Sequence, residues 1–225
     1  MTTKHEFKQK SINALKYMNT HADNLEEPNT EMVVVLTAYM KTKGQGSSNK
    51  PTSHEAGIAV VLEAHGFVLA HRKLNPADDG YYYRYQGKGS QQKGDFEVFW
   101  VKHGNVQSKL MLDAKHSNTK SIILNDGWFD EETIYIISYN AGTSKYPKYS
   151  CFIGLGRDIP TECDDKIMYH IREIKKELNK TKKTMFTNFL SICFRFANQY
   201  SCKQFTQEFT EDRLQKTLEW LEPSL

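Results

Sequence analysis

The sequence lacks the features that would place the protein in a membrane or in an oxidising compartment. Its 225 residues contain no apolar run of about 18, the length that a membrane-spanning helix requires. The segment after Met1 is polar and does not resemble a signal peptide. The four cysteines never occur in C-x-x-C spacing, which argues against a structural zinc site and predicts free thiols. We therefore expect a cytoplasmic protein without a membrane partner.

A strong excess of charge of either sign is also absent. The formal net charge is +3, so the overall charge by itself indicates no particular partner. Hydrophobic residues make up 39% and charged residues 25% of the chain, which is typical of a globular protein and not of a disordered one. No internal repeat is present. At this length we expect one domain over residues 1–225.

The sequence does contain an alternation of helical and strand patterns. Apolar spacing predicts helices at residues 11–25, 31–40 with Asn29 or Thr30 as cap, 54–64 capped by Ser53, 164–182, 185–200 and 208–221. Apolar and β-branched runs predict strands at residues 67–74, 96–102, 106–112, 133–139 and 150–155. Loops are expected at residues 41–51 and 75–93. This order predicts an α/β protein with a mixed sheet, a helical N-terminal extension over 1–50, a core over 53–155 and a helical C-terminal part over 164–225.

The most informative stretch is Gly94-Asp95-Phe96, followed eighteen residues after the aspartate by Asp113-Ala114-Lys115. The intervening residues read as a β-hairpin with its turn at His103-Gly104-Asn105. A turn centred on Gly104 places Asp95 opposite Asp113, and cross-strand partners have Cβ atoms about 4.5–5.5 Å apart. Side chains alternate along a strand, so Lys115 shares a face with Asp113. Two facing carboxylates repel unless a cation lies between them, and Mg²⁺ suits such a place.

These motifs resemble those of the PD-(D/E)XK nuclease superfamily, and within it the chain looks most like a type II restriction endonuclease. The resemblance covers roughly residues 53–140 and includes a helix that carries Glu55, eleven residues before Gly66. The chain departs from the family pattern at Gly94, where the family name has proline. It departs again at Asp113, where glutamate is more usual.

The resemblance implies a restriction-endonuclease-like core, in which a mixed central β-sheet is flanked by helices. It implies that Asp95, Asp113 and Glu55 bind Mg²⁺ and that Lys115 assists the attacking water. The expected activity is hydrolysis of double-stranded DNA at a specific short sequence by a homodimer, with a cognate DNA methyltransferase in the same system. The alternatives are a structure-selective repair or junction-resolving nuclease of the same superfamily, or a non-catalytic DNA-binding protein with this fold.

Candidate DNA-binding residues lie in two segments. Arginine, lysine and glutamine are the side chains that pair with phosphates and with base edges in the major groove. The expected contacts are Arg84, Lys88, Gln91, Gln92 and Lys93 before the hairpin, and Lys180, Lys182 and Lys183 in the C-terminal part. Several simpler interpretations stay open. The tyrosines at 81–85 are also compatible with packing, the lysines with a solvated helix face, and Glu55 with an acid that favours the helix dipole.

Overall fold

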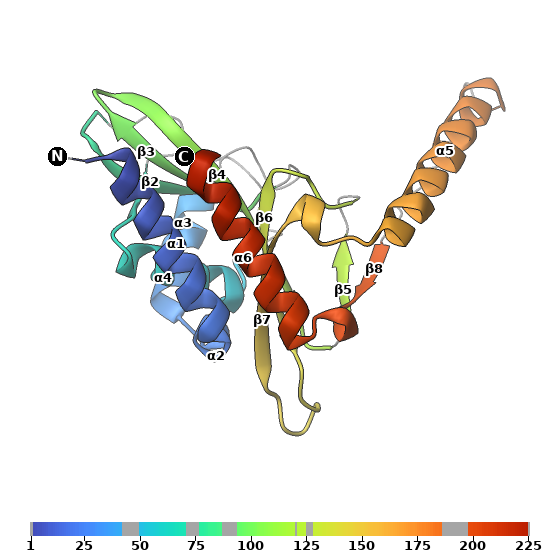
Figure 1. The fold of residues 1–225 in the computed structure, drawn as a ribbon, viewed down its shortest axis with the longest axis horizontal. Coiled ribbons are helices and arrows are strands. Elements are labelled where there is room, and N and C mark those ends of the chain that lie inside the picture. The colour runs from blue at the N-terminus through green and yellow to red at the C-terminus, as the bar shows by residue number, and fades with distance from the viewer. Residues whose placement is uncertain are drawn as a thin grey trace.

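The structure, a computed structural model, describes residues 2–41, 50–70, 77–86, 94–119, 121–124, 128–185 and 198–224. A six-stranded sheet forms its centre, with the strand order β1-β2-β3-β4-β6-β7 (Figure 1). These strands are Val68–Leu69, Gly80–Tyr85, Phe96–Lys102, Asn105–Ser117, Thr133–Asn140 and Tyr149–Leu155. A separate two-stranded sheet pairs β5 (Ser121–Leu124) with β8 (Asn198–Ser201).

The sheet is mixed, as the sequence predicts. Strand β1 runs parallel to β2, the strands β2, β3 and β4 are successively antiparallel, β4 is parallel to β6, and β6 is antiparallel to β7. Strand β4 is 13 residues long and has a neighbour on each side. Because it lies inside the sheet, its position is held by backbone hydrogen bonds on both edges.

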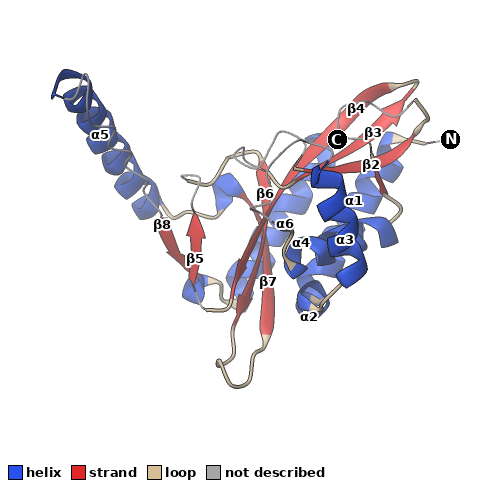
Figure 2. Ribbon diagram, turned by 180° about the vertical axis from the view of Figure 1, so that it is seen from behind, coloured by secondary structure: helices blue, strands red, loops and turns tan. Residues whose placement is uncertain are grey.

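The helices of the described chain are distributed unevenly around this sheet. They are α1 (Lys4–Thr20), α2 (Ala22–Glu26), α3 (Thr30–Lys41), α4 (Ser53–Ala64), α5 (Glu162–Met185) and α6 (Gln207–Ser224). Helices α1, α2, α3 and α4 gather at one side, α6 runs along β7, and α5 extends away from the rest (Figures 1 and 2). None of the helices in the described ranges combines the length and the apolar composition needed to cross a bilayer.

Two hydrophobic clusters lie on opposite faces of the sheet. Ile134 and Ile136 of β6 pack in one cluster with helices α1, α3 and α4, whereas Tyr135 and Ile137 pack in the other with Phe205. This division follows from the alternation of side chains along a strand. Every residue of β6 is buried, which requires cover on both faces. Mixed sheets covered on both faces are the expected result of the predicted order of elements.

Several predicted elements are confirmed with shifted ends. Helix α4 begins with a capping box in which Thr52, and not Ser53, is the cap. Helix α3 carries a cap at Asn29, whose side-chain oxygen accepts a hydrogen bond from the backbone N–H of Met32 at 2.9 Å. The single helix predicted at residues 11–25 is divided at His21 into α1 and α2. Gly66 ends α4 with a φ of +82°, as predicted for a glycine that follows a helix.

Other expectations were wrong. The predicted loop at 75–93 contains a strand, β2, over Gly80–Tyr85, because Tyr83 and Tyr85 are large apolar side chains that bury fully against the sheet. The last residues of the predicted helix at 185–200 form part of strand β8, and residues 186–197 lie outside the described ranges. The described part of the predicted strand at 67–74 is a strand only at Val68–Leu69. Residues 42–49 and 71–76 are also outside the described ranges.

The contact between α4 and α2 depends on Gly57. A Cβ atom at this position would lie 2.5 Å from the backbone oxygen of Leu25 and 2.7 Å from its Cα, so the two helices would have to separate. We predict that Gly57→Ala lowers the free energy of unfolding by roughly 1–3 kcal/mol, the usual cost of overpacking. Chemical denaturation measures this change. The control is Gly104→Asn, where open space and a left-handed turn tolerate the new side chain; an equal loss in both variants would contradict the packing argument.

Candidate active site on strands β3 and β4

The hairpin of β3 and β4 places the two aspartates side by side. Phe96 pairs with Leu112, and Asp95 directly precedes β3 as Asp113 follows Leu112 in β4, so an extension of the pairing by one residue sets the two aspartates opposite each other. The turn itself differs from the expectation. It is the two-residue turn His103-Gly104, with φ values of 52° and 71°, the signs that a type I′ hairpin turn requires.

A β-bulge restores the register of the two aspartates. Trp100 pairs with Ser108 while Val101 pairs with Val106, so one additional residue, Gln107, is inserted in β4. Without this residue, the two-residue turn would place Asp95 opposite Leu112, whose side chain belongs to the other face of the sheet. The bulge is therefore the local feature that brings the two carboxylates onto the same face.

Gly94 occupies a backbone conformation that proline cannot adopt. Its φ is +89°, whereas the ring of proline restricts φ to about −65°. A Cβ atom at this position would also lie 2.6 Å from the terminal methyl carbon of Met111. The chain enters β3 through a turn that favours glycine for both reasons.

Lys115 and Asp113 form a close ion pair on one face of β4. The Lys115 Nζ lies 2.5 Å from Asp113 Oδ1, and the exposed fractions of the two side chains are 20% and 7%. Asp95 is held next to them, because its Oδ2 accepts a hydrogen bond from the backbone N–H of Ala114 at 2.9 Å. The structure thus brings together the two carboxylates and the ammonium group that the sequence places on one face.

Negative charge is concentrated at Asp95. Burial raises the pKa of its carboxyl group, and repulsion from Asp113 and from Glu55 adds to this, while Lys115 and the N–H of Ala114 act in the opposite direction. The result is a pKa of about 7, against an ordinary value of 3.8. Lys115 therefore compensates only part of the charge of the carboxylates. A site with this balance favours the binding of an additional cation.

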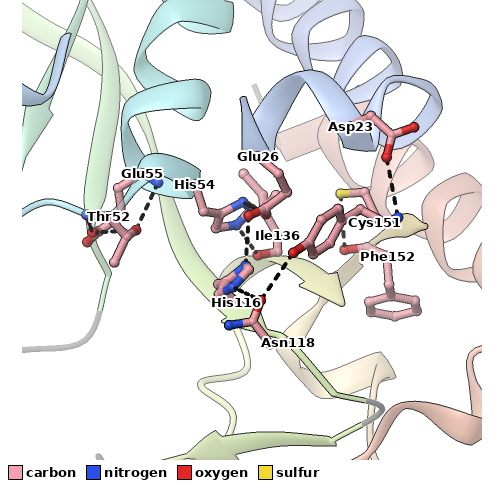
Figure 3. A network of polar contacts seen from close by, with 11 residues as sticks. Asp23, Glu26, Thr52, His54, Glu55, His116, Asn118, Ile136, Cys151 and Phe152 are labelled. Carbon is pink, nitrogen blue, oxygen red and sulfur yellow. Dashed lines mark hydrogen bonds and ion pairs between the residues drawn. The ribbon is translucent and has the colours of Figure 1, made fainter. Parts of the chain in front are cut away.

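Glu55 reaches this site through its charge, but its carboxylate has other hydrogen bonds. Oε2 accepts hydrogen bonds from the backbone N–H and the hydroxyl of Thr52, at 2.6 and 2.8 Å, which closes the capping box of α4 (Figure 3). Oε1 accepts a hydrogen bond from the hydroxyl of Tyr85 at 2.8 Å. The simpler interpretation of Glu55, an acid at a helix N-terminus, thus describes its contacts, and its proximity to Asp95 keeps it within the electrostatic field of the site.

The structure describes only some of the predicted DNA-binding residues. Arg84 is buried in β2, where its guanidinium lies 2.9 Å from Glu97 Oε2 and 4.2 Å from the centre of the Phe99 ring. Arg84 would have to leave these contacts to reach DNA. The described ranges exclude Lys88, Gln91, Gln92 and Lys93. They include the backbone of Lys180, Lys182 and Lys183 on α5, but not the side chains.

On the other face of β4, the structure shows a polar network that we did not expect from the sequence. Glu26, at the end of α2, lies between two histidines: its Oε1 is 3.1 Å from His54 Nδ1 and its Oε2 is 2.9 Å from His116 Nδ1 (Figure 3). His54 directly precedes Glu55 on α4, and His116 directly follows Lys115 on β4. The only sequence signal is this adjacency of the histidines to site residues, which gives no indication of Glu26.

The network is strongly polarised. Burial would raise the pKa of Glu26, but the contacts with His116 and His54 outweigh burial and lower that pKa to about 2. The same contact with Glu26 raises the pKa of His116, against the opposing effect of burial. A carboxylate between two imidazoles thus connects α2, α4 and β4. It holds together the two elements that carry Glu55 and Lys115.

Comparison with protein-family models, curated proteins and solved structures finds no match to this chain. Within the described residues, no group of three or more histidine, cysteine, aspartate and glutamate side chains has an arrangement able to hold a metal ion. Mg²⁺ is commonly bound by one or two carboxylates and completed by water, so a pair such as Asp95 and Asp113 is a sufficient protein contribution. The pair Asp95 and Asp113, together with Lys115, is therefore the feature of the described residues that indicates a function.

The raised pKa of Asp95 predicts how the site affects stability. The pKa of Asp95 in the folded protein lies above its ordinary value. The contribution of Asp95 to the free energy of unfolding therefore falls as pH rises from about 4 to about 7. We predict that Asp95→Asn unfolds at nearly the same temperature as the parent below pH 4. Above pH 7 it is expected to be more stable by roughly 2–4 kcal/mol.

Mg²⁺ provides the control for this experiment. A cation that binds the native carboxylates stabilises the parent protein but has little effect on Asp95→Asn. Thermal unfolding with and without Mg²⁺ at pH 8 separates the two variants. An equal effect of Mg²⁺ on both would show that Asp95 is not a ligand.

Glu26→Gln tests the network on the opposite face of β4. The stabilisation from the lowered pKa of Glu26 is present above about pH 4.5 and is lost as pH falls towards 2. The stabilisation from His116 is present below pH 6.5 and is lost as pH rises through its raised pKa. We therefore predict that Glu26→Gln costs roughly 1.5–3 kcal/mol, most of it between pH 4.5 and 6.5. Denaturation across pH, with NMR titration of His116, measures it; a deficit independent of pH would contradict the ionic interpretation.

Proposed function

We propose that this protein is a Mg²⁺-dependent endonuclease of type II restriction character, which hydrolyses phosphodiester bonds of double-stranded DNA. The observation that carries the proposal is the register of β3 and β4, which places Asp95 opposite Asp113 with the Lys115 ammonium 2.5 Å from Asp113. The mixed sheet with flanking helices is compatible with the restriction-endonuclease-like core that the sequence resemblance implies.

In this proposal Asp95 and Asp113 hold the cation. A bound divalent cation polarises a phosphoryl oxygen and lowers the pKa of a coordinated water. Lys115 supplies positive charge close to the developing negative charge of the scissile phosphate and orients the attacking water. Glu55 would have to exchange its hydrogen bonds with Thr52 and Tyr85 to become a metal ligand. Its role in the described geometry is to hold α4 beside the site and to add negative charge.

The proposed substrate and partners follow from this class of enzyme. A homodimer with two-fold symmetry matches a palindromic DNA site, because protein and DNA then share one symmetry axis. A cognate DNA methyltransferase would protect the host's own sites. Lys88, Gln91, Gln92 and Lys93 directly precede β3 and thus remain candidates for contacts near the scissile phosphate, while Lys180, Lys182 and Lys183 are candidates for phosphate contacts.

The second candidate is a structure-selective repair or junction-resolving nuclease of the same superfamily. The burial of Arg84 in its ion pair with Glu97 favours this alternative, because it removes one predicted reader of base edges from the surface. A non-catalytic DNA-binding protein is disfavoured by the cost of keeping a buried carboxylate, Asp113, beside the partly buried Asp95 without a use for them.

Incubation with plasmid DNA and Mg²⁺ distinguishes these candidates directly. Discrete fragments on a gel identify a sequence-specific endonuclease, and a smear identifies a nuclease without sequence preference. Cleavage of a four-way junction, with linear duplex left intact, identifies the structure-selective candidate. Intact DNA in every case, at pH 8 where Asp95 is ionised, would overturn the nuclease proposal.

Substitutions on β4 provide the matched test of chemistry. We predict that Asp113→Asn and Lys115→Ala each slow cleavage by roughly 1,000-fold or more, because each removes charge from the site of phosphoryl transfer. Lys115→Arg should not restore the rate, since guanidinium is bulkier and does not release its proton. Lys109→Ala is the control, because Lys109 lies on the same face of β4 but its side chain is 57% exposed and lies 3.8 Å from Glu97.

Binding is measured separately from cleavage. Gel-shift assays in Ca²⁺ should show that Asp113→Asn retains DNA binding, because the aspartate is proposed to be a metal ligand and not a DNA contact. Single-turnover rates in Mg²⁺ then report the chemical step. Cleavage by Asp113→Asn at the rate of Lys109→Ala would rule out the assigned site.

A further inference from the structure

Helix α5 is an arm that projects from the body of the protein (Figures 1 and 2). Its 24 residues correspond to a length of about 36 Å. Near its first turn, the indole N–H of Trp128 donates a hydrogen bond to Asp165 at 3.1 Å. Beyond that base, no helix or strand in the described ranges packs extensively against it. Most of the stability of a helix in a protein comes from packing of its apolar face, so a partner that covers one side would stabilise this arm.

The arm carries an apolar seam. Ile167, Ile171, Ile174 and Leu178 follow one another in steps of four, three and four residues, the spacing of the a and d positions of a coiled coil. In the structure Ile167 is 53% exposed and Ile174 is 57% exposed, and Ile171 between them is partly exposed. Aliphatic side chains aligned in this way on one side of a projecting helix gain free energy when another helix covers them.

Charged side chains are excluded from this seam. The ion pairs Lys166–Glu162 and Lys176–Glu173, with distances of 2.7 and 2.6 Å, link positions c and f of the same heptad pattern, on the opposite side of the helix. Tyr169, which is 61% exposed, also occupies position f. The helix is therefore divided into an apolar side and a charged side, as in the strand of a coiled coil.

The charge along the arm is also unequal, and this selects the partner. Acidic residues cluster at the base, at Glu162, Asp164 and Asp165, whereas the second half of the helix is rich in lysine: Lys175, Lys176, Lys180, Lys182 and Lys183. An antiparallel copy of the same helix places its basic half against the acidic base. A parallel copy would place like charges beside each other.

We propose that α5 pairs with α5 of a second copy of this chain as an antiparallel two-stranded coiled coil. Ile167 of one arm then lies opposite Leu178 of the other, and Ile171 lies opposite Ile174, so all four seam residues find an apolar partner. This arrangement has a two-fold axis across the middle of the arms, and it closes as a dimer without leaving an unused copy of the seam. The inference deepens the dimeric part of the proposed function and does not depend on cleavage.

Sedimentation equilibrium of the full chain measures the dimer. Replacement of two exposed seam residues, Ile167→Ser with Ile174→Ser, is expected to raise the dimer dissociation constant by roughly 100-fold or more, because apolar burial is lost on both arms. The matched control is Tyr169→Ser, which removes an exposed aromatic side chain from the opposite side of the same helix and should leave the dissociation constant unchanged. Thermal unfolding checks that the body of each variant is intact.

Cysteine cross-linking tests the orientation, in a background with Cys163→Ser and Cys193→Ser. When Ile167→Cys and Leu178→Cys proteins are mixed and oxidised, the antiparallel pairing forms a disulfide between the two different chains. Each variant alone should stay uncrosslinked, since its own cysteines lie about 16 Å apart along the pair. Efficient cross-linking within each single variant would indicate parallel arms and overturn the proposal.

Other outcomes overturn it as well. A parent chain that is monomeric at every concentration would overturn the proposal. So would a seam variant that keeps the parent's dissociation constant. A seam variant that loses thermal stability as a monomer would show that residues of its own chain cover the seam. Failure of the nuclease proposal is recognised separately, because a dimer that does not cleave DNA leaves the arm pairing intact.

Discussion

The candidate site depends on the crowding of two carboxylates across the antiparallel pair β3 and β4. Asp95, which is partly buried, lies beside the buried Asp113, and one ammonium group, that of Lys115, compensates only part of their charge. Burial first, and then repulsion from the neighbouring carboxylates, raise the pKa of Asp95 to about 7. Backbone hydrogen bonds on both edges of β4 hold the arrangement against the repulsion. The repulsion between the carboxylates lowers the stability of the native protein, and a bound cation would remove this cost. Perturbed pKa values of this kind are common at functional sites.

The two faces of β4 have different tasks. One face presents Asp113 and Lys115, and the other presents His116 to Glu26, which also contacts His54 of α4. Because side chains alternate along a strand, adjacent residues of one segment serve the candidate site and its attachment to the helices. Adjacent residues of α4 are divided in the same way: His54 belongs to the network, and Glu55 closes the capping box beside Asp95. Movement of α4 relative to β4 would disturb both.

Local patterns account for the elements that the sequence predicts well. The pairing of β3 with β4 follows from hairpin signals, and the ends of α4 follow from capping and from Gly66, but the opposed positions of Asp95 and Asp113 also require a bulge. The bulge at Gln107 was not foreseen, because it depends on how β4 meets its neighbours. Strand β2 was missed because its tyrosines lie between polar and glycine-rich segments, and burial against the sheet decided their conformation.

The sequence by itself determined the mixed α/β class, the hairpin and the face shared by Asp113 and Lys115, because period-two alternation and turn chemistry act over a few residues. Only the tertiary structure decided three other features. It buried Arg84 against Glu97 and Phe99, it placed Glu26 between His54 and His116, and it left Ile167 and Ile174 of α5 exposed. Each of these joins or separates segments that are distant along the chain, and such contacts depend on how whole elements pack against one another.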